Sequence, residues 1–171
     1  MIIRRATYED IPTMMRIFEA AKAIMRASGN LHQWGSGYPN EDVLKRDIDA
    51  ESSYIVCNTC GEVVATMAFI PGPDQTYSVI YDGEWPDDNP YYVIHRIAVA
   101  SSGGGIARQL LDWAFERTDT LRIDTHRDNC IMHHILQKYG FVQCGVIKLA
   151  NGDDRDAYHL TKKKSLDNAN N

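Results

Sequence analysis

Two consecutive strand-to-helix units constrain this chain more than any other feature of its sequence. In the first, an apolar segment ends in Arg96-Ile97-Ala98-Val99 and runs into three consecutive glycines at 103–105, after which a helical pattern begins. The second runs from Leu121 to a helical pattern led by Asn129. The free N–H groups at the start of a helix form an anion site. Two adjacent units, one of them lined by glycine, therefore predict a phosphorylated ligand held between them.

Length and composition limit the classes of protein to consider. At 171 residues with 44% hydrophobic content, the chain can bury the core of one domain. Its net charge of −5 disfavours a nucleic-acid partner. No apolar run approaches the roughly 20 residues that span a bilayer, and the N-terminus lacks a signal-peptide pattern. We expect a cytoplasmic protein without a membrane partner, and four cysteines are too few to predict a disulfide framework.

Periodicity and turn residues give the expected elements. A first helix starts near Thr7, and an aromatic-bearing segment at 71–90 is expected to contain a short helix at 76–82. Other predicted helices are 41–50, 105–117 and 129–139, and predicted strands are 2–6, 54–57, 63–69, 91–99, 121–126, 141–147 and 157–160. No linker or repeat interrupts this order, so one domain is expected over 1–161, followed by a polar, frayed tail over 162–171.

The glycine turn does not match two common nucleotide motifs. A nucleoside-triphosphate loop ends in Gly-Lys-Ser/Thr, and a dinucleotide fingerprint has the spacing Gly-x-Gly-x-x-Gly; neither occurs here. The Cys57-x-x-Cys60 spacing lacks a second ligand pair, so we interpret it as a hairpin turn and expect no metal site.

The order of elements resembles the GNAT family of N-acetyltransferases over nearly the whole chain. Gly105-Ile106-Ala107 match the end of that family's pyrophosphate motif, and Ser102 stands where arginine or glutamine is usual. The resemblance implies one α/β domain, with helices on both faces of a mixed, mostly antiparallel sheet. It also implies acetyl-CoA as co-substrate. The cofactor-binding residues it implies are Ile97, Ala98, Val99, Ser102, Gly103, Gly104, Gly105, Ile106, Ala107, Asn129 and Met132.

A second family motif follows the second strand and ends in Gly140-Phe141. By this resemblance Asn129 contacts the pantetheine arm of the cofactor. Leu136 stands where the family often has a tyrosine that protonates the leaving thiolate. Tyr139 lies close to Leu136 in sequence, but three positions turn it about 60° around the helix. We interpret Tyr139 as a packing residue and leave the general acid open.

Two histidines are candidates for the base that an amine acceptor needs. The family polarises the thioester carbonyl with a backbone N–H that the resemblance places within 97–99. Strand alternation is expected to put His95 on the same face as Ile97. His126, which ends the neighbouring strand, is the second candidate, and Asp124 is interpreted as structural. The alternative for His95 is a histidine that only packs in the sheet.

The acceptor itself is not identified by the sequence. Trp34, Tyr81, Trp85 and Tyr91 are candidates for the wall of an acceptor pocket, although ordinary core packing explains aromatic residues as well. The favoured hypothesis is acetyl transfer from acetyl-CoA to a primary amine on a small molecule or a protein. The alternatives are a non-catalytic acyl-CoA binding module and a transferase for longer acyl groups. A homodimer is left open.

Overall fold

One seven-stranded sheet organises the protein. A computed structural model describes residues 1–35, 37–101 and 104–162. The strand order is β1-β2-β3-β4-β5-β7-β6; β4 and β5 pair in parallel, and the other described neighbours are antiparallel. The predicted mixed, mostly antiparallel sheet is confirmed. The strands are β1 (Ile2–Arg5), β2 (Ser53–Cys57), β3 (Val63–Pro71), β4 (Tyr92–Val99), β5 (Thr120–Thr125), β6 (Val142–Lys148) and β7 (Asp154–Thr161).

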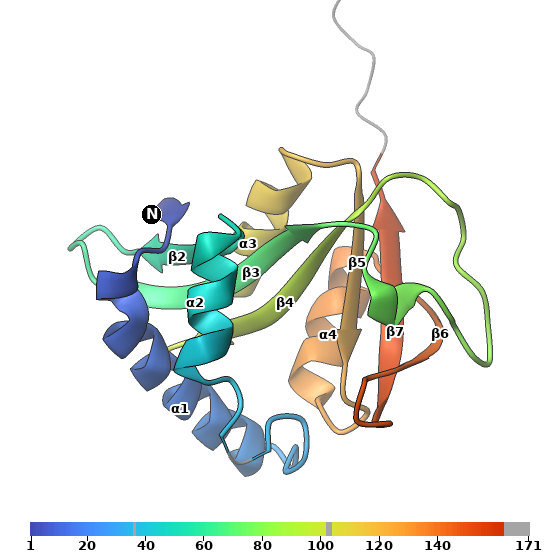
Figure 1. Cartoon of the computed structure of the whole chain (residues 1–171), viewed down its shortest axis with the longest axis horizontal. Coiled ribbons are helices and arrows are strands. Elements are labelled where there is room, and N and C mark those ends of the chain that lie inside the picture. The colour runs from blue at the N-terminus through green and yellow to red at the C-terminus, as the bar shows by residue number, and fades with distance from the viewer. Residues whose placement is uncertain (36, 102–103, 163–171) are drawn as a thin grey trace, which may run out of the picture.

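Helices cover both faces of this sheet, as expected (Figure 1). On one face, α1 (Ile11–Ala27) buries an apolar stripe that includes Met14 and Phe18 against Ile55 and Ala98 of the sheet. Beside it lies α2 (Glu41–Asp49). On the other face, α3 (Ile106–Phe115) and α4 (Cys130–Tyr139) cover the larger core cluster. Two short 3-10 helices, η1 (Tyr8–Asp10) and η2 (Gln75–Tyr77), complete the elements.

The sheet opens between β4 and β5. Their register contains only two pairs, Tyr92 with Leu121 and Val93 with Arg122, near the start of both strands. Beyond these pairs the strands diverge towards their carboxyl ends (Figure 1). The residues of β4 from Ile94 onward therefore have one backbone edge that faces a gap in the sheet.

A bulge in β4 corrects one expectation about His95. Ala68 pairs with His95 and Thr66 with Ala98, so β4 holds one residue more than β3 over this interval. Arg96 has φ 53°, as the extra residue of a bulge. Ile94, Ile97 and Val99 consequently pack in the α3/α4 core, whereas Ala98 packs against α1. The prediction that His95 and Ile97 share a face was wrong, because the bulge reverses the alternation between them.

The segment at 71–90 differs from its prediction. No helix forms at 76–82; only η2, at Gln75–Tyr77, is helical. Tyr81 forms a β-bridge with Val146 instead, which extends the sheet beyond β6. Gly83 packs so closely on this edge that an added Cβ would lie 1.9 Å from the carbonyl oxygen of Cys144. This tertiary pairing outweighs the local helical pattern.

The remaining boundaries agree with the sequence to within a few residues. Among the residues the structure describes, no helix is long and apolar enough to cross a membrane. The cytoplasmic location stays a prediction. Apart from residue 162, the predicted tail lies outside the described residues, as do Ser102 and Gly103.

Candidate active site

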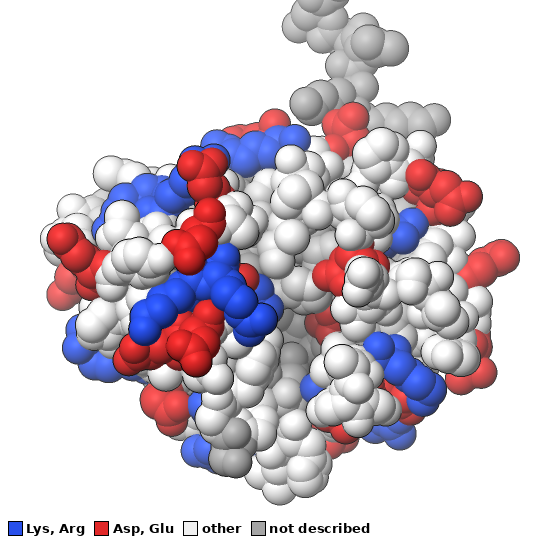
Figure 2. Space-filling view, in the orientation of Figure 1, with Lys and Arg blue, Asp and Glu red and all other residues white. Residues whose placement is uncertain are grey.

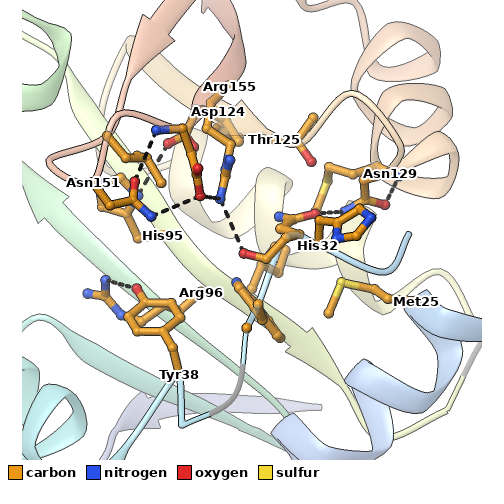
Figure 3. Close-up of a pocket in the computed structure, with 18 of the residues that line it drawn as sticks. Met25, His32, Tyr38, His95, Arg96, Asp124, Thr125, Asn129, Asn151 and Arg155 are labelled. Carbon is orange, nitrogen blue, oxygen red and sulfur yellow. Dashed lines mark hydrogen bonds and ion pairs between the residues drawn. The ribbon is translucent and has the colours of Figure 1, made fainter. Parts of the chain in front are cut away.

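A cavity of about 540 Å³ opens where β4 and β5 diverge. Figure 2 shows this face of the molecule hollowed near its middle, with side chains of both charges around the hollow. The loop between α1 and α2 covers one side, and the β6–β7 hairpin covers another. The polar residues in its wall include His32, Gln33, Tyr38, His95, Arg96, Asp124, Thr125, Asn129, Asn151, Asp153 and Arg155 (Figure 3).

An apolar groove adjoins the cavity. It lies between α1, β4, α3 and α4, and its wall is almost wholly aliphatic. Groove and cavity share Met25, Ile97, Asn129 and Met132, so the gap in the sheet joins them. Its other lining residues are Ala21, Ile24, Ala98, Val99, Ala107, Ile131 and Ile135.

The glycine turn leads into α3 at the side of this groove. Gly104 and Gly105 have φ of 71° and 67°, a left-handed conformation that glycine adopts at little cost. Gly105 caps α3 without a side chain, and a Cβ built there would meet nothing within 4 Å. The first bond inside the helix runs from Gln109 to Gly105, and within the described part of the chain the amides of Ile106 and Ala107 have no helical partner. An open helix start without acidic residues suits a phosphate group.

The diverging edge of β4 directs backbone donors towards the gap. The N–H of Ala100 donates to Val64 on β3. Because successive residues of a strand point their N–H groups to opposite sides, Val99 and Ile97 direct theirs away from β3. Ala98 directs its N–H towards β3. Of the three predicted residues, Ile97 and Val99 thus have donors that can meet a carbonyl in the gap.

Asn129 lies at the junction of groove and cavity but already has partners. Its Oδ1 accepts the N–H of Met132 at 3.1 Å and so caps α4. Its Nδ2 donates to Oε1 of Gln33 at 2.6 Å. Asn129 therefore fixes the start of α4 and holds the covering loop, while its backbone N–H donates to His126 and its carbonyl accepts from His133.

His95 lies between two carboxylates. Its Nε2 is 2.8 Å from Oδ2 of Asp74, and its Nδ1 is 3.5 Å from Oδ1 of Asp124. The same Asp124 oxygen accepts the hydroxyl of Tyr77 at 2.7 Å. With the proton on Nε2 held by Asp74, the lone pair of Nδ1 faces Asp124. His95 and Asp124 both line the cavity, which gives one end of it a carboxylate beside an imidazole.

Asp74 is fixed from several directions. Its carboxylate accepts the backbone N–H and the hydroxyl of Thr76, at 2.8 and 2.6 Å. Its own N–H donates to the hydroxyl oxygen of Tyr91 at 3.0 Å. The hydrogen bond from His95, above all, holds the pKa of Asp74 well below its usual range. Asp74 is therefore ionised at neutral pH and keeps the histidine in one orientation.

His126 lies beside the cavity, in a neighbouring surface depression. Its Nδ1 accepts the N–H of Asp128 at 3.1 Å. Burial and then the charge of Arg155 lower its pKa. The structure brings His95, rather than His126, together with the gap between β4 and β5.

The four aromatic candidates separate into two groups. Trp34 lines the cavity and packs edge-on against Phe18 of α1. Trp85 and Tyr91 instead stack on both faces of the buried Arg122 guanidinium, at 4.1 and 4.0 Å from their ring centres. Tyr81 is exposed on the bridge to β6. The structure does not bring these last three to the cavity wall, although Tyr91 acts on the site through Asp74.

Leu136, at the position of the family's tyrosine, and Tyr139, the substitute considered for it, both lie outside the cavity wall. Leu136 is fully buried in the core under α3 and α4. Tyr139 stacks on Phe115, and its hydroxyl donates to Asp112 at 2.6 Å. Burial raises the pKa of Tyr139. This placement agrees with the interpretation of Tyr139 as a packing residue.

Sequence reasoning missed several residues of the site. Asp74 and Tyr77 belong to the aromatic-bearing segment, whose unusual length was the available signal. Asp124 was interpreted as structural, but it lines the cavity 3.5 Å from His95. Arg155 precedes the predicted start of the last strand, and no motif or residue spacing in the sequence indicated that it would line the site.

Comparison with known proteins shows the family and the fold. A model of the acetyltransferase (GNAT) family matches residues 14–141, about three quarters of the chain. The chain belongs to the GNAT family. It is therefore an N-acetyltransferase of one α/β domain.

Several solved structures resemble the chain over nearly its whole length. A GNAT acetyltransferase from Streptococcus agalactiae 2603 is 34% identical, with coverage of 95% of this chain and 96% of that one and a TM-score of 0.86. A ribosomal-protein-alanine N-acetyltransferase from Brucella melitensis shares the fold at 19% identity, with coverage of 94% and 99% and a TM-score of 0.62. The NatC complex bound to Gag peptide and CoA also shares the fold, at 19% identity, with coverage of 95% of this chain and 98% of that one and a TM-score of 0.56. No curated protein matches the chain.

Proposed function

We propose that this GNAT protein transfers the acetyl group of acetyl-CoA to a primary amine, with His95 as the base. One observation carries the proposal: the apolar groove and the polar cavity meet at the gap between β4 and β5. An acyl carrier fits the groove and an amine fits the acidic end of the cavity, so the two substrates meet at the gap.

The groove and the open end of α3 support acetyl-CoA as the donor. When bound, acetyl-CoA supplies an activated acyl thioester. The amides of Ile106 and Ala107 would hold its pyrophosphate, and the aliphatic wall would hold the pantetheine arm. The N–H groups of Ile97 and Val99 would polarise the thioester carbonyl. The predicted cofactor contacts of Ser102 and Gly103 lie outside the described residues.

The acidic end of the cavity supports the acceptor half of the reaction. Asp124 would pair with the incoming ammonium, and the Nδ1 lone pair of His95 would accept the proton that the amine must lose. Asp74 keeps the other ring nitrogen protonated and stabilises the imidazolium that results. His126 remains the second candidate base because it lies beside the cavity.

The leaving thiolate needs no tyrosine at Leu136 under this proposal. A thiolate at the junction of groove and cavity would lie near the amino-terminal end of α4, where the helix dipole would stabilise it. Protonation by solvent or by the amine's own proton, carried on His95, then completes the step.

Turnover of acetyl-CoA with a panel of primary amines, followed by thiol release, tests the function. We expect acceptor-dependent thiol release that falls roughly 10²–10⁴-fold in His95→Ala, the range for a lost general base. His126→Ala is the matched variant and is expected to retain most of the activity. Calorimetry should show unchanged acetyl-CoA affinity in both.

Two results would contradict the proposal in different ways. Binding of acetyl-CoA without thiol release for any amine would support the alternative of a non-catalytic binding module. Faster release from longer acyl-CoA esters than from acetyl-CoA would show that the acyl group was assigned wrongly.

A further inference from the structure

We propose that the acceptor amine also carries a carboxylate, and that Arg155 binds it. This inference rests on the proposed function and names the class of acceptor: a small zwitterion of the amino-acid type. The argument comes from the charges that face the cavity.

Arg155 is a buried cation in the cavity wall. It lies at the start of β7, and its side chain is only 5% exposed. Its hydrogen bonds go to two backbone carbonyls, those of Asp154 at 2.9 Å and Gln33 at 3.2 Å. A buried charge is costly unless a charged partner neutralises it. Two carbonyl oxygens do not supply that charge.

The nearby carboxylate of Asp153 neutralises Arg155 poorly. Its Oδ2 lies 4.0 Å from Nη2 of Arg155. The same oxygen accepts Nδ2 of Asn151 at 2.9 Å, and the Asp153 side chain is half-exposed to solvent. The positive charge of Arg155 is also felt at His126, whose pKa it helps to lower.

Arg96 shows the contrast within the same cavity. It donates two hydrogen bonds to the Asp47 carboxylate, at 2.9 and 2.8 Å, so this guanidinium has its counter-ion in the protein. Of the two arginines in the described cavity wall, Arg155 is thus the one left to bind an anion.

A second polar group in the wall also lacks a partner. The hydroxyl of Thr125 is fully buried, lines the cavity and makes no hydrogen bond within the described part of the chain. Buried hydroxyls in proteins are nearly always hydrogen-bonded, so an unbonded one in a cavity wall indicates a polar ligand. Figure 3 shows Thr125 and Arg155 among the side chains around the cavity.

The two charged regions define the ligand. Asp124 and His95 suit an ammonium group, and Arg155 suits a carboxylate, for which a guanidinium is the best-matched cation. Both regions face one cavity of about 540 Å³, a volume that fits a small molecule. A purely cationic amine would leave Arg155 unpaired and would be repelled by it.

Matched acceptors provide the test. For several L-amino acids, the free acid, its amide and the amine without the carboxyl group are compared by thiol release from acetyl-CoA. We expect kcat/KM to be roughly 10–100-fold higher for the acid, the range for a charge-assisted hydrogen bond. In Arg155→Gln this preference should disappear because the KM for the acid rises, while the amide reacts as before. Arg155→Lys should restore part of the preference.

Controls separate recognition from folding. Arg127→Gln removes a nearby arginine whose side chain is 68% exposed, and it should keep the preference for the acid. Calorimetry of the free acid with wild type and Arg155→Gln, in the presence of CoA, measures recognition without turnover. Thermal unfolding and acetyl-CoA binding show whether the variant is folded.

The outcomes distinguish this inference from the proposed function. Equal use of acid and amide by the wild type, or an equal loss for both in Arg155→Gln, would overturn the role of Arg155. An equal loss for both acceptors would mean that Arg155 only holds the Gln33 backbone in place. If acids bind through Arg155 but no amine is acetylated, the proposed transfer fails and the recognition stands.

Discussion

Replacing Asp74 with asparagine tests how the base is oriented. In the native protein the Asp74 carboxylate accepts the proton on Nε2 of His95 at 2.8 Å, which leaves the Nδ1 lone pair towards Asp124 and the cavity. Asparagine has the same size, but its amide can donate to Nε2. The ring proton would then move to Nδ1, where the proposed reaction needs a lone pair.

The expected size of the effect follows from the bond that is lost. A hydrogen bond to a charged group contributes about 1.5–3 kcal/mol, and each 1.4 kcal/mol is a factor of ten. If this energy stabilises the imidazolium formed in the transition state, kcat should fall by roughly 10–150-fold. The KM for acetyl-CoA should stay unchanged, since Asp74 does not line the groove.

The assay is thiol release at saturating acetyl-CoA, measured across pH 6 to 9. Asp88→Asn, the same change at an exposed position of the same segment, is the control and should behave as wild type. An Asp74→Asn protein that folds normally and keeps wild-type kcat at every pH would refute the reasoning. In that case His95 does not depend on Asp74 for its protonation state.

Four further results are expected. Gly105→Glu should abolish acetyl-CoA binding, measured by calorimetry, because it adds bulk and negative charge at the start of α3. Gly105→Ala, whose Cβ would meet open space, should lower the free energy of unfolding by about 1–2 kcal/mol and keep most of the affinity for acetyl-CoA. Leu136→Tyr should lower the free energy of unfolding by about 1–3 kcal/mol, measured by urea denaturation, because the site is fully buried. Tyr139→Phe should change kcat by less than about tenfold, and a folded variant that loses ~10² would show that Tyr139 is the acid. Because the pKa of Asp74 is lowered in the folded state, its carboxylate contributes stability that is present above about pH 4 and is lost progressively as the pH falls below that value. The difference between the urea midpoints of wild type and Asp74→Asn should therefore be smaller at pH 3 than at pH 7.

Local patterns were enough to predict most of the elements. The apolar stripe of α1, the left-handed glycine at the end of α4 and the amphipathic face of α3 are short-range signals, and the structure has all three helices. The same holds for the glycine turn and for the two adjacent strand-to-helix units, whose strands the structure pairs in parallel. His95 was predicted as a candidate base because it lies on the strand of the first unit, although its expected shared face with Ile97 was wrong.

The bulge and the partners of His95 could not be read from the sequence. Nothing local shows that Arg96 takes a left-handed conformation, yet this residue reverses the faces of β4 beyond it. Asp74 lies 21 residues before His95, and Asp124 lies 29 after it. Asp74 reaches His95 from the 71–90 segment, which folds back on β6, and Asp124 reaches it because β5 pairs with β4. Both contacts depend on pairing between distant strands.

By itself, then, the sequence determined the order of elements, the glycine-capped helix that favours an anion and the family resemblance, because each depends on neighbours in the chain. Only the tertiary structure decided which charges share the cavity. Asp124 and Arg155 of the cavity wall come from two strands, and Asp74, behind His95, comes from a loop. Arg155 is only weakly neutralised because the packing around it supplies carbonyl oxygens and leaves the Asp153 carboxylate 4.0 Å away. Burial of charge is a property of the assembled fold, since it depends on every element that excludes water from the group.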